Sequence, residues 1–123
     1  MTKEAALQAF YERFLPAYQE NAVPTGANKP AYPYITYEMA TDSWGTPVAL
    51  SASLWYRTTS WLAPNAMSRS IERAIGRTGL YLPCDGGAVY ISRGKPFSRS
   101  GSDADDTIKR KILTIMVEYL TED

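Results

Sequence analysis

The stretch Val48-Ala49-Leu50-Ser51-Ala52-Ser53-Leu54-Trp55-Tyr56-Arg57 alternates between two sets of side chains. One set is mainly aliphatic and consists of Val48, Leu50, Ala52, Leu54 and Tyr56. The other set consists of Ser51, Ser53, Trp55 and Arg57. Because successive side chains of a strand point to opposite faces, this pattern predicts a strand with one buried face. Trp55 falls outside the aliphatic set, so we expect it on the outer face, either covered or held for a contact with another subunit.

A second alternating segment precedes this strand. Residues 34–40 place Ile35, Tyr37 and Met39 on one face, and Thr36 and Glu38 on the other. This pattern predicts a half-buried strand. Turn-forming residues follow it at positions 42–47. We therefore expect the two strands to pair as an antiparallel hairpin.

Two segments with helical periodicity lie on either side of this hairpin. In residues 3–15 the apolar side chains recur at intervals of three and four: Leu7, Phe10, Tyr11 and Phe14. In residues 61–76 the buried stripe is expected to be Met67, Ile71, Ala74 and Ile75. Both patterns predict amphipathic helices, the first ending before Pro16 and the second at Gly76 or Gly79. The connection over residues 16–33 is long and has no periodicity.

The C-terminal third of the chain predicts further strands. Residues 80–84 and 88–92 flank Asp85-Gly86-Gly87, a sequence typical of a hairpin turn. Residues 107–120 fit either a strand or a helix, and their β-branched residues favour the strand. We expect a single domain over residues 1–123 with an α+β fold. Its mainly antiparallel sheet should have about four to five strands, with two helices packed on one face.

Composition and charge exclude several classes of function. Thirteen basic residues balance thirteen acidic ones, which gives no argument for a nucleic-acid or membrane partner. The chain has no histidine and one cysteine, Cys84. This excludes Ser-His-Asp and Cys-His catalysis and a structural zinc site, and we expect Cys84 to be an inert packing residue. The chain has no apolar segment typical of a signal peptide or a membrane helix. We therefore expect a protein that stays in the cytoplasm unless a larger assembly carries it out.

Two groups of basic residues are the best candidates for a partner surface. The first group is spaced four residues apart along the second helix, and its members are Arg69, Arg73 and Arg77. The second group surrounds Phe97 in a loop, and its members are Arg93, Lys95 and Arg99. Either group can meet phosphates or carboxylates, or form a solvated face. The neutral chain favours a protein partner over a nucleic acid.

Acidic and glycine-containing motifs carry weaker signals. Asp103, Asp105 and Asp106 form the densest carboxylate cluster, but the glycine and glutamate positions of a calcium loop are missing. The favoured interpretation is a solvated loop. Gly94-Lys95 does not match a phosphate-binding loop, because Val89 occupies the position of its first glycine and Pro96 follows the lysine. We expect no metal and no cofactor.

Four phrases follow one another in a fixed order. They are Tyr32-Pro33-Tyr34-Ile35-Thr36-Tyr37-Glu38, Leu54-Trp55-Tyr56-Arg57-Thr58-Thr59-Ser60-Trp61, Asp85-Gly86-Gly87-Ala88-Val89-Tyr90-Ile91 and Arg93-Gly94-Lys95-Pro96-Phe97-Ser98. The last part of the pattern is the segment from Asp103 to Leu120, which begins with several aspartates and continues with several isoleucines. This order resembles the tail-terminator, or tail-completion, proteins of siphovirus-type phages and prophages of Gram-positive bacteria. The resemblance spans most of the chain and is least clear over residues 16–31.

The resemblance implies a structural virion protein and no enzyme. Proteins of this family form hexameric rings that cap the head-proximal end of the tail tube, end its growth and join the tail to the head. The implied partners are further copies of the chain, the tail tube protein and the head-side connector protein, without a membrane or a specific nucleic acid. The implied location is the virion tail, with the host cytoplasm during assembly. The interface candidates are Arg69, Arg73, Arg77, Arg93, Lys95, Phe97 and Trp55.

Three alternatives remain open from the sequence. The first is another head-tail connector or neck protein. The second is a small nucleic-acid-binding module that uses the two basic groups, and salt-dependent DNA binding would support it. The third is a small hydrolase that uses Asp103, Asp105 and Asp106, which ranks last because no base, nucleophile or glycine cradle accompanies these residues.

Overall fold

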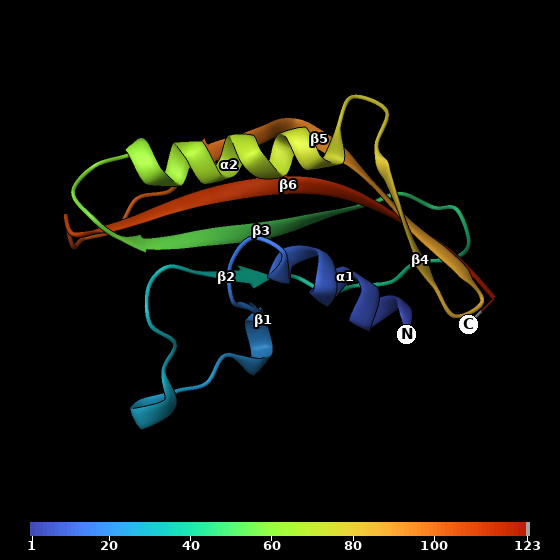
Figure 1. The fold of residues 1–123 in the computed structure, drawn as a ribbon, viewed down its shortest axis with the longest axis horizontal. Coiled ribbons are helices and arrows are strands. Elements are labelled where there is room, and N and C mark those ends of the chain that lie inside the picture. The colour runs from blue at the N-terminus through green and yellow to red at the C-terminus, as the bar shows by residue number, and fades with distance from the viewer. Residues whose placement is uncertain (123) are drawn as a thin grey trace.

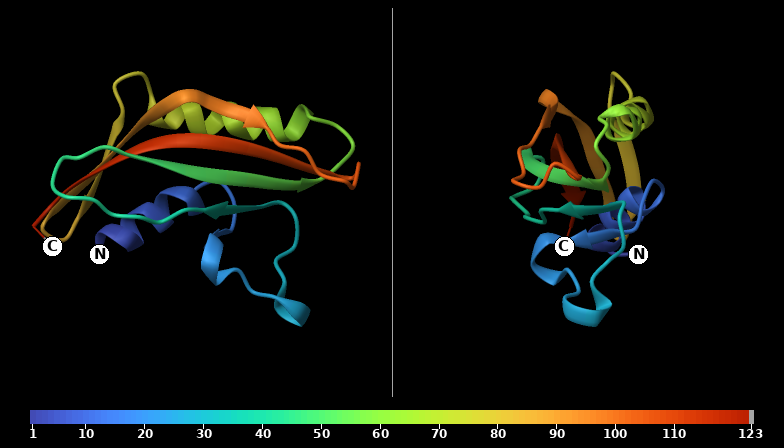
Figure 2. Two further views of the ribbon diagram at one scale, coloured as in Figure 1. Left: turned by 180° about the vertical axis from the view of Figure 1, so that it is seen from behind. Right: turned by 90° about the vertical axis from the view of Figure 1, so that its left-hand side faces the viewer.

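A six-stranded sheet in the order β1-β2-β3-β6-β5-β4 forms the framework of the computed structural model, which describes residues 1–122 (Figure 1). The strands are β1 (Ala17–Gln19), β2 (Tyr34–Tyr37), β3 (Val48–Arg57), β4 (Leu80–Cys84), β5 (Gly87–Ser100) and β6 (Ile108–Thr121). The helices are α1 (Lys3–Glu12) and α2 (Leu62–Ile75), with short 3-10 turns η1 (Glu20–Ala22) and η2 (Gly26–Asn28). Both helices lie on one side of the curled sheet (Figure 2).

The α+β fold with two helices is confirmed, but the predicted sheet was incomplete. The sheet is mixed, because β1 runs parallel to β2 while all other neighbouring strands are antiparallel. Strand β1 has three residues and lies in the connection that we expected to be irregular. Residues 107–120 lie largely in strand β6, which confirms the choice of strand over helix. Strand β5 extends well beyond the expected residues 88–92, because β6 pairs with it along both parts of its length.

Helix α1 closes the curl of the sheet. Thr2 is its N-cap, and the Thr2 hydroxyl accepts a hydrogen bond from the Ala5 amide at 3.1 Å. The helix contacts β1, β4 and β5, so it lies against both edge strands of the sheet. Its buried side chains are Ala6, Leu7, Phe10 and Tyr11. The helix ends at Glu12, earlier than predicted, and Phe14 packs against the core from outside the helix.

Helix α2 packs across β3, β5 and β6. Gly76 ends it with a φ of 77°, a conformation that favours glycine, and the Gly76 amide donates to the Glu72 carbonyl at 3.0 Å. The buried residues of the helix are Pro64, Ser68, Ile71 and Ile75. The prediction that Ala74 is buried is wrong: the buried stripe runs along positions 64, 68, 71 and 75, and Ala74 is exposed. Arg77 lies beyond the end of the helix and not on it.

Strand β2 is buried on both faces, which corrects the expectation of a half-buried strand. Ile35 and Tyr37 face the core, as predicted. On the other face, Trp55 donates a hydrogen bond from Nε1 to the Thr36 hydroxyl at 2.8 Å. The Tyr34 ring stacks on the same tryptophan with 6.3 Å between ring centroids. Large side chains of neighbouring strands therefore shield this face, which no helix of the described residues covers.

A register shift interrupts the pairing of β5 with β6. The shift lies between Arg93 and Ser98, and the intervening residues bulge out of the ladder. Gly94 sits at this point against Thr114, where an added Cβ would lie 2.5 Å from Thr114 Cγ2 and 2.8 Å from the Thr114 carbonyl oxygen. The close approach of the two strands requires glycine here.

Candidate functional site

A hollow beside the end of α2 gathers members of both predicted basic groups. Its volume is about 390 Å³. It is lined by Glu72, Arg77, Ser92, Arg93, Gly94, Lys95, Pro96 and Phe97. We refer to it as the basic groove. Four of the seven predicted interface residues meet here: Arg77, Arg93, Lys95 and Phe97.

Two local features build the basic groove. The turn at Gly76 carries the chain away from the α2 axis and places Arg77 at the rim. The bulge between Arg93 and Ser98 turns Lys95 and its neighbours out of the sheet ladder. Arg93 on β5 lies directly opposite the buried Ile115 on β6. Because directly opposite side chains share a face of the sheet, Arg93 lies on the face that carries the helices. Its Nη1 lies 3.4 Å from Glu72 Oε2 on α2.

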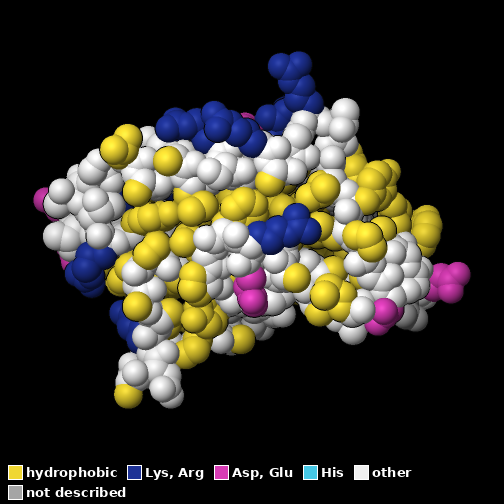
Figure 3. All heavy atoms as spheres, in the orientation of Figure 1, with side chains coloured by type: hydrophobic (Ala, Val, Ile, Leu, Met, Phe, Trp, Pro, Cys, Tyr) yellow, Lys and Arg dark blue, Asp and Glu magenta, His cyan; other side chains and the backbone are white. Residues whose placement is uncertain are grey.

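The groove keeps an excess of positive charge. Glu72 offsets one guanidinium, that of Arg93. Within residues 1–122, the side chains of Arg77 and Lys95 have no ion-pair or hydrogen-bond partner. Arg69 and Arg73 are exposed on the outer side of α2 and extend the same positive field. Figure 3 shows Lys and Arg side chains gathered over α2 along one border of the molecule.

Trp55 lies on the other face of the sheet, in a second candidate surface. Three aromatic rings follow one another there in a row with a guanidinium group at each end, and we call this row the aromatic ladder. Its members are Arg57, Tyr32, Tyr34, Trp55 and Arg110. The Arg57 guanidinium lies 5.0 Å from the Tyr32 ring centroid, and the Arg110 guanidinium 4.8 Å from that of Trp55. These separations are in the range of cation–π contacts.

Hydrogen bonds hold the ladder in place. The Arg110 Nε donates to the Ser53 hydroxyl at 3.0 Å, beside the bond from Trp55 to Thr36. A hollow of about 300 Å³ lies next to the ladder, lined by Glu20, Val23, Tyr34, Thr36, Trp55 and Arg110. Sequence reasoning found Trp55 alone in this surface. The other members become neighbours through the pairing of β2 with β3 and of β3 with β6, in which Trp55 lies opposite both Tyr34 and Arg110.

Hydrogen bonds fix the shape of the acidic loop, which lies apart from the basic groove and next to Arg57 of the aromatic ladder. We use this name for residues 103–106, between β5 and β6. Asp103 Oδ1 accepts from the Asp105 amide at 2.9 Å, and Asp105 Oδ1 accepts from the Thr107 hydroxyl at 2.7 Å and the Thr107 amide at 2.8 Å. The bonds from Thr107 lower the pKa of Asp105, and the positive charges of Arg57 and Lys109 act in the same direction. The carboxylates are exposed, as expected for a solvated loop.

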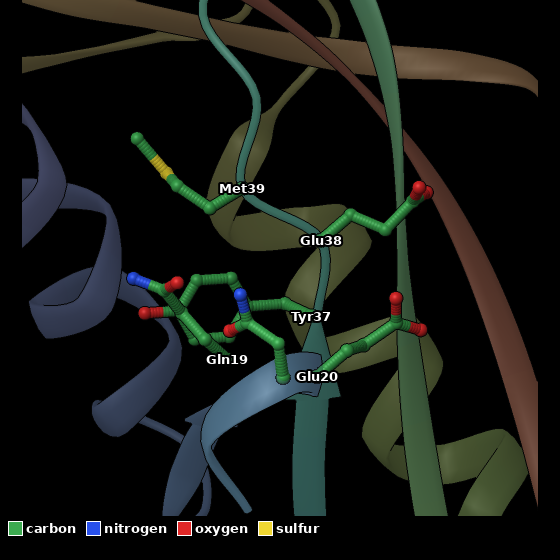
Figure 4. Close-up of a pocket in the computed structure, with 6 residues that line it drawn as sticks. Gln19, Glu20, Tyr37, Glu38 and Met39 are labelled. Carbon is green, nitrogen blue, oxygen red and sulfur yellow. The ribbon is translucent and has the colours of Figure 1, made fainter.

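A smaller hollow of about 160 Å³ lies where β1 and β2 end (Figure 4). Glu20 and Glu38 both extend to the same side of it in Figure 4. Glu38 already has a structural role, because its Oε1 accepts from the Ser51 amide at 2.7 Å and from the Ser51 hydroxyl at 2.6 Å. This carboxylate therefore accepts hydrogen bonds from β3 at a point beyond the end of β2, where β3 has no further pairing with that strand.

Metal and thiol chemistry receive little support from the geometry. Within residues 1–122, no three His, Cys, Asp or Glu side chains are grouped so that they could hold a metal ion. Partial burial, with Asp85 adjacent, raises the pKa of the Cys84 thiol. A raised pKa keeps the sulfur protonated near neutral pH, which fits the expected packing role.

The chain matches no protein-family model, no curated protein and no solved structure. The part of the chain that the structure describes contains no helix long and apolar enough to cross a membrane.

Proposed function

We propose that this chain is a structural protein of a long-tailed phage that forms a ring at the head-proximal end of the tail tube. In this role it ends tube growth and joins the tail to the head-side connector, without a catalytic step. Its partners are further copies of the chain, the tail tube protein and the connector protein. It acts in the virion and assembles in the host cytoplasm.

One observation carries this proposal: three of the four phrases that resemble tail terminators contribute side chains to the aromatic ladder and the basic groove. The first phrase contributes Tyr32 and Tyr34, and the second contributes Trp55 and Arg57, to the aromatic ladder. The fourth phrase, residues 93–98, lines the basic groove. A motif that served only the core would have buried side chains throughout. The side chains of these phrases are instead partly buried and partly exposed to solvent.

The composition of the aromatic ladder supports a protein partner. Trp, Tyr and Arg are the residues most enriched among those that dominate the binding energy of protein interfaces. Their side chains are already held by ring stacking and by the bonds to Thr36 and Ser53. Binding would therefore lose little conformational entropy.

The placement of the two surfaces supports a ring. The basic groove lies on the helix-bearing face of the sheet, and the aromatic ladder lies on the opposite face. A protomer with two different contact surfaces can join its neighbours head to tail, and such contacts close into a ring when the rotation between protomers permits.

Another neck protein remains the nearest alternative, since it would use the same partners. A nucleic-acid-binding module is a second candidate, because Arg69, Arg73, Arg77 and Lys95 form one positive border. Glu72 in the groove and the zero net charge favour the protein partner.

Two measurements test the proposal: the solution mass by light scattering, and co-sedimentation with purified tail tubes. We expect a mass of several protomers, or saturable binding to tube ends that stops further polymerisation. A chain that remains monomeric and does not bind tubes would contradict the proposal. Binding to the connector protein but not to tubes would instead favour another neck protein.

A matched pair of substitutions locates the tube or neighbour contact. Trp55→Ala should weaken binding by about 2 kcal/mol, roughly thirtyfold, if the ladder is an interface centre. Trp44→Ala removes another tryptophan, which is 64% exposed in a turn, and should leave binding unchanged. Arg57→Ala removes a member at one end of the ladder. It provides a second test of the interface if the Trp55→Ala variant does not fold. Thermal melting of each variant checks that the fold is retained.

A further inference from the structure

We propose that the basic groove of one protomer receives the acidic loop of a second copy of this chain. The inference rests on the proposed ring function and adds the contact that joins neighbouring protomers. The inference is based on two features of the same molecule. One is a groove with unpaired positive charges, and the other is an ordered, exposed loop with negative charges.

The groove offers charge that the molecule itself does not neutralise. Arg77 and Lys95 are exposed and lack partners within the described residues, while Arg93 is paired with Glu72. Phe97 adds an apolar wall that is partly buried against the core. A cationic groove with an aromatic wall is suited to a short acidic segment.

The loop offers the complementary charge in a fixed shape. The carboxylates of Asp103, Asp105 and Asp106 are exposed, and the lowered pKa of Asp105 keeps that group ionised. Backbone bonds also order the loop, since the Ile108 amide donates to the Asp105 carbonyl at 3.0 Å. An ordered loop loses little entropy on binding, so more of the charge attraction is retained.

A protomer cannot fill its own groove with its own loop. The acidic loop lies near the start of α2, because the Thr58 amide donates to the Thr107 carbonyl at 2.7 Å. The basic groove lies at the other end of α2, where Glu72 and Arg77 line it. The helix between them has 14 residues and is roughly 20 Å long. Figure 1 shows the β5–β6 loop at one tip of the molecule, near the end where α2 begins. The contact is therefore intermolecular.

The contact joins two different surfaces and is consequently heterologous. Each protomer retains an open groove at one junction and an open loop at the other, so addition can continue until the chain of protomers closes. Zero net charge supports this arrangement, because protomers attract through local patches without strong overall repulsion.

Charge reversal tests the pairing directly. The groove variant is Arg77→Glu/Lys95→Glu, and the loop variant is Asp103→Lys/Asp106→Lys, which leaves the hydrogen bonds of the Asp105 side chain in place. Each variant alone places like charges at every junction and should lose association at least tenfold. An equimolar mixture restores opposite charges at every junction, and association should return. A single chain with all four substitutions has the original net charge and should also associate.

Control variants separate this contact from a general effect of net charge. Arg13→Glu/Lys29→Glu matches the charge change of the groove variant, and Asp42→Lys/Glu122→Lys matches that of the loop variant. All four control positions are exposed and lie outside the two surfaces. The controls should associate like the unmodified chain in sedimentation velocity. Association of the unmodified chain should weaken with salt, because the Debye length falls from about 10 Å at 0.1 M to about 3 Å at 1 M.

Several outcomes would overturn the inference. It fails if neither the mixture nor the fourfold chain recovers association, or if every sample is monomeric up to about 1 mM. It also fails if labelled duplex DNA binds the groove and the groove variant alone abolishes that binding. If the reversed variants still form rings on tail tubes, the groove–loop contact is wrong while the proposed function stands. Failure of the unmodified chain to bind tubes tests the proposed function separately.

Discussion

Tyr11 and Tyr37 share one ring stack, but their hydroxyl groups have opposite surroundings. The ring centroids are 4.7 Å apart and the planes differ by 28°. The Tyr37 hydroxyl donates to the Gln8 side chain, whose amide nitrogen donates to the Ala17 carbonyl at 2.7 Å. The Tyr11 hydroxyl is buried and has no hydrogen-bond partner within residues 1–122. Burial raises the pKa of Tyr11, because ionisation would place a charge in the core.

This contrast predicts opposite responses to removal of the two hydroxyls. Tyr11→Phe removes an unpaired polar atom from the core and should leave the free energy of unfolding equal or higher by about 1 kcal/mol. Tyr37→Phe breaks the link to Gln8 and should lower it by about 1 kcal/mol. Urea unfolding curves of both variants and the unmodified protein provide the comparison. A Tyr11→Phe variant less stable than Tyr37→Phe would show that the hydroxyl has a partner.

At the scale of elements, the bulge of β5 combines an exposed edge with a candidate interface. Strand β4 pairs with β5 only as far as Ile91, so within residues 1–122 the remainder of β5 has no strand on that side. Lys95 and Pro96 lie in this open portion. A charged residue and a proline hinder addition of another strand at an edge. The bulge thus favours contact through side chains over extension of the sheet.

Gly94→Ala should disturb this bulge. The new Cβ would meet the Thr114 carbonyl oxygen at 2.8 Å, so the strands must separate locally. We expect a loss of about 1–3 kcal/mol in the free energy of unfolding, typical of overpacking. Gly101→Ala is the control, since its nearest contacts would be 3.3 Å and include the Arg110 side chain. Equal melting temperatures for the two variants would contradict the close packing of Gly94 on β6.

At the scale of the whole molecule, buried tyrosines make stability sensitive to high pH. Burial raises the pKa of Tyr34, Tyr37 and Tyr56. It also raises the pKa of Tyr119 from 10.0 to about 12. The folded chain therefore keeps these protons at pH values at which the unfolded chain releases them.

The sign of the pH dependence follows from this difference in bound protons. The contribution of Tyr119 is fully present below pH 10 and is lost as the pH rises through about 12. We expect the urea midpoint to fall over this range. Tyr119→Phe should show a shallower fall, and absorbance of tyrosinate should rise together with unfolding. A midpoint that is constant from pH 9 to pH 12 would exclude the effect.

Long periodic segments were predictable, and short or shielded ones were not. Strands β3 and β6 repeat their alternation over many residues because one face packs on the core along most of their length. Strand β1 has three residues, too few to show a period, and the pairing of the Ile35 amide with the Pro16 carbonyl at 2.8 Å helps to place it. The second buried face of β2 depends on the cover provided by Trp55.

The candidate surfaces also contain features that were predictable from the sequence and features that were not. Arg93, Lys95 and Phe97 were identifiable as a basic group around an aromatic residue, because that property is local to the sequence. Their meeting with Arg77 depends on the φ of Gly76 and on the register shift of β5, which no local pattern specifies. Arg110 joins Trp55 only through the register of β3 with β6.

The sequence by itself determined the α+β class, the two amphipathic helices and the long strands, because hydrophobic period is a property of consecutive residues. It also determined the charge balance and the absence of histidine-based chemistry. Only the tertiary structure decided the parallel edge strand, the two-sided burial of β2, the basic groove and the aromatic ladder. These features arise from contacts between segments far apart in the chain, and strand register together with backbone geometry decides which side chains meet.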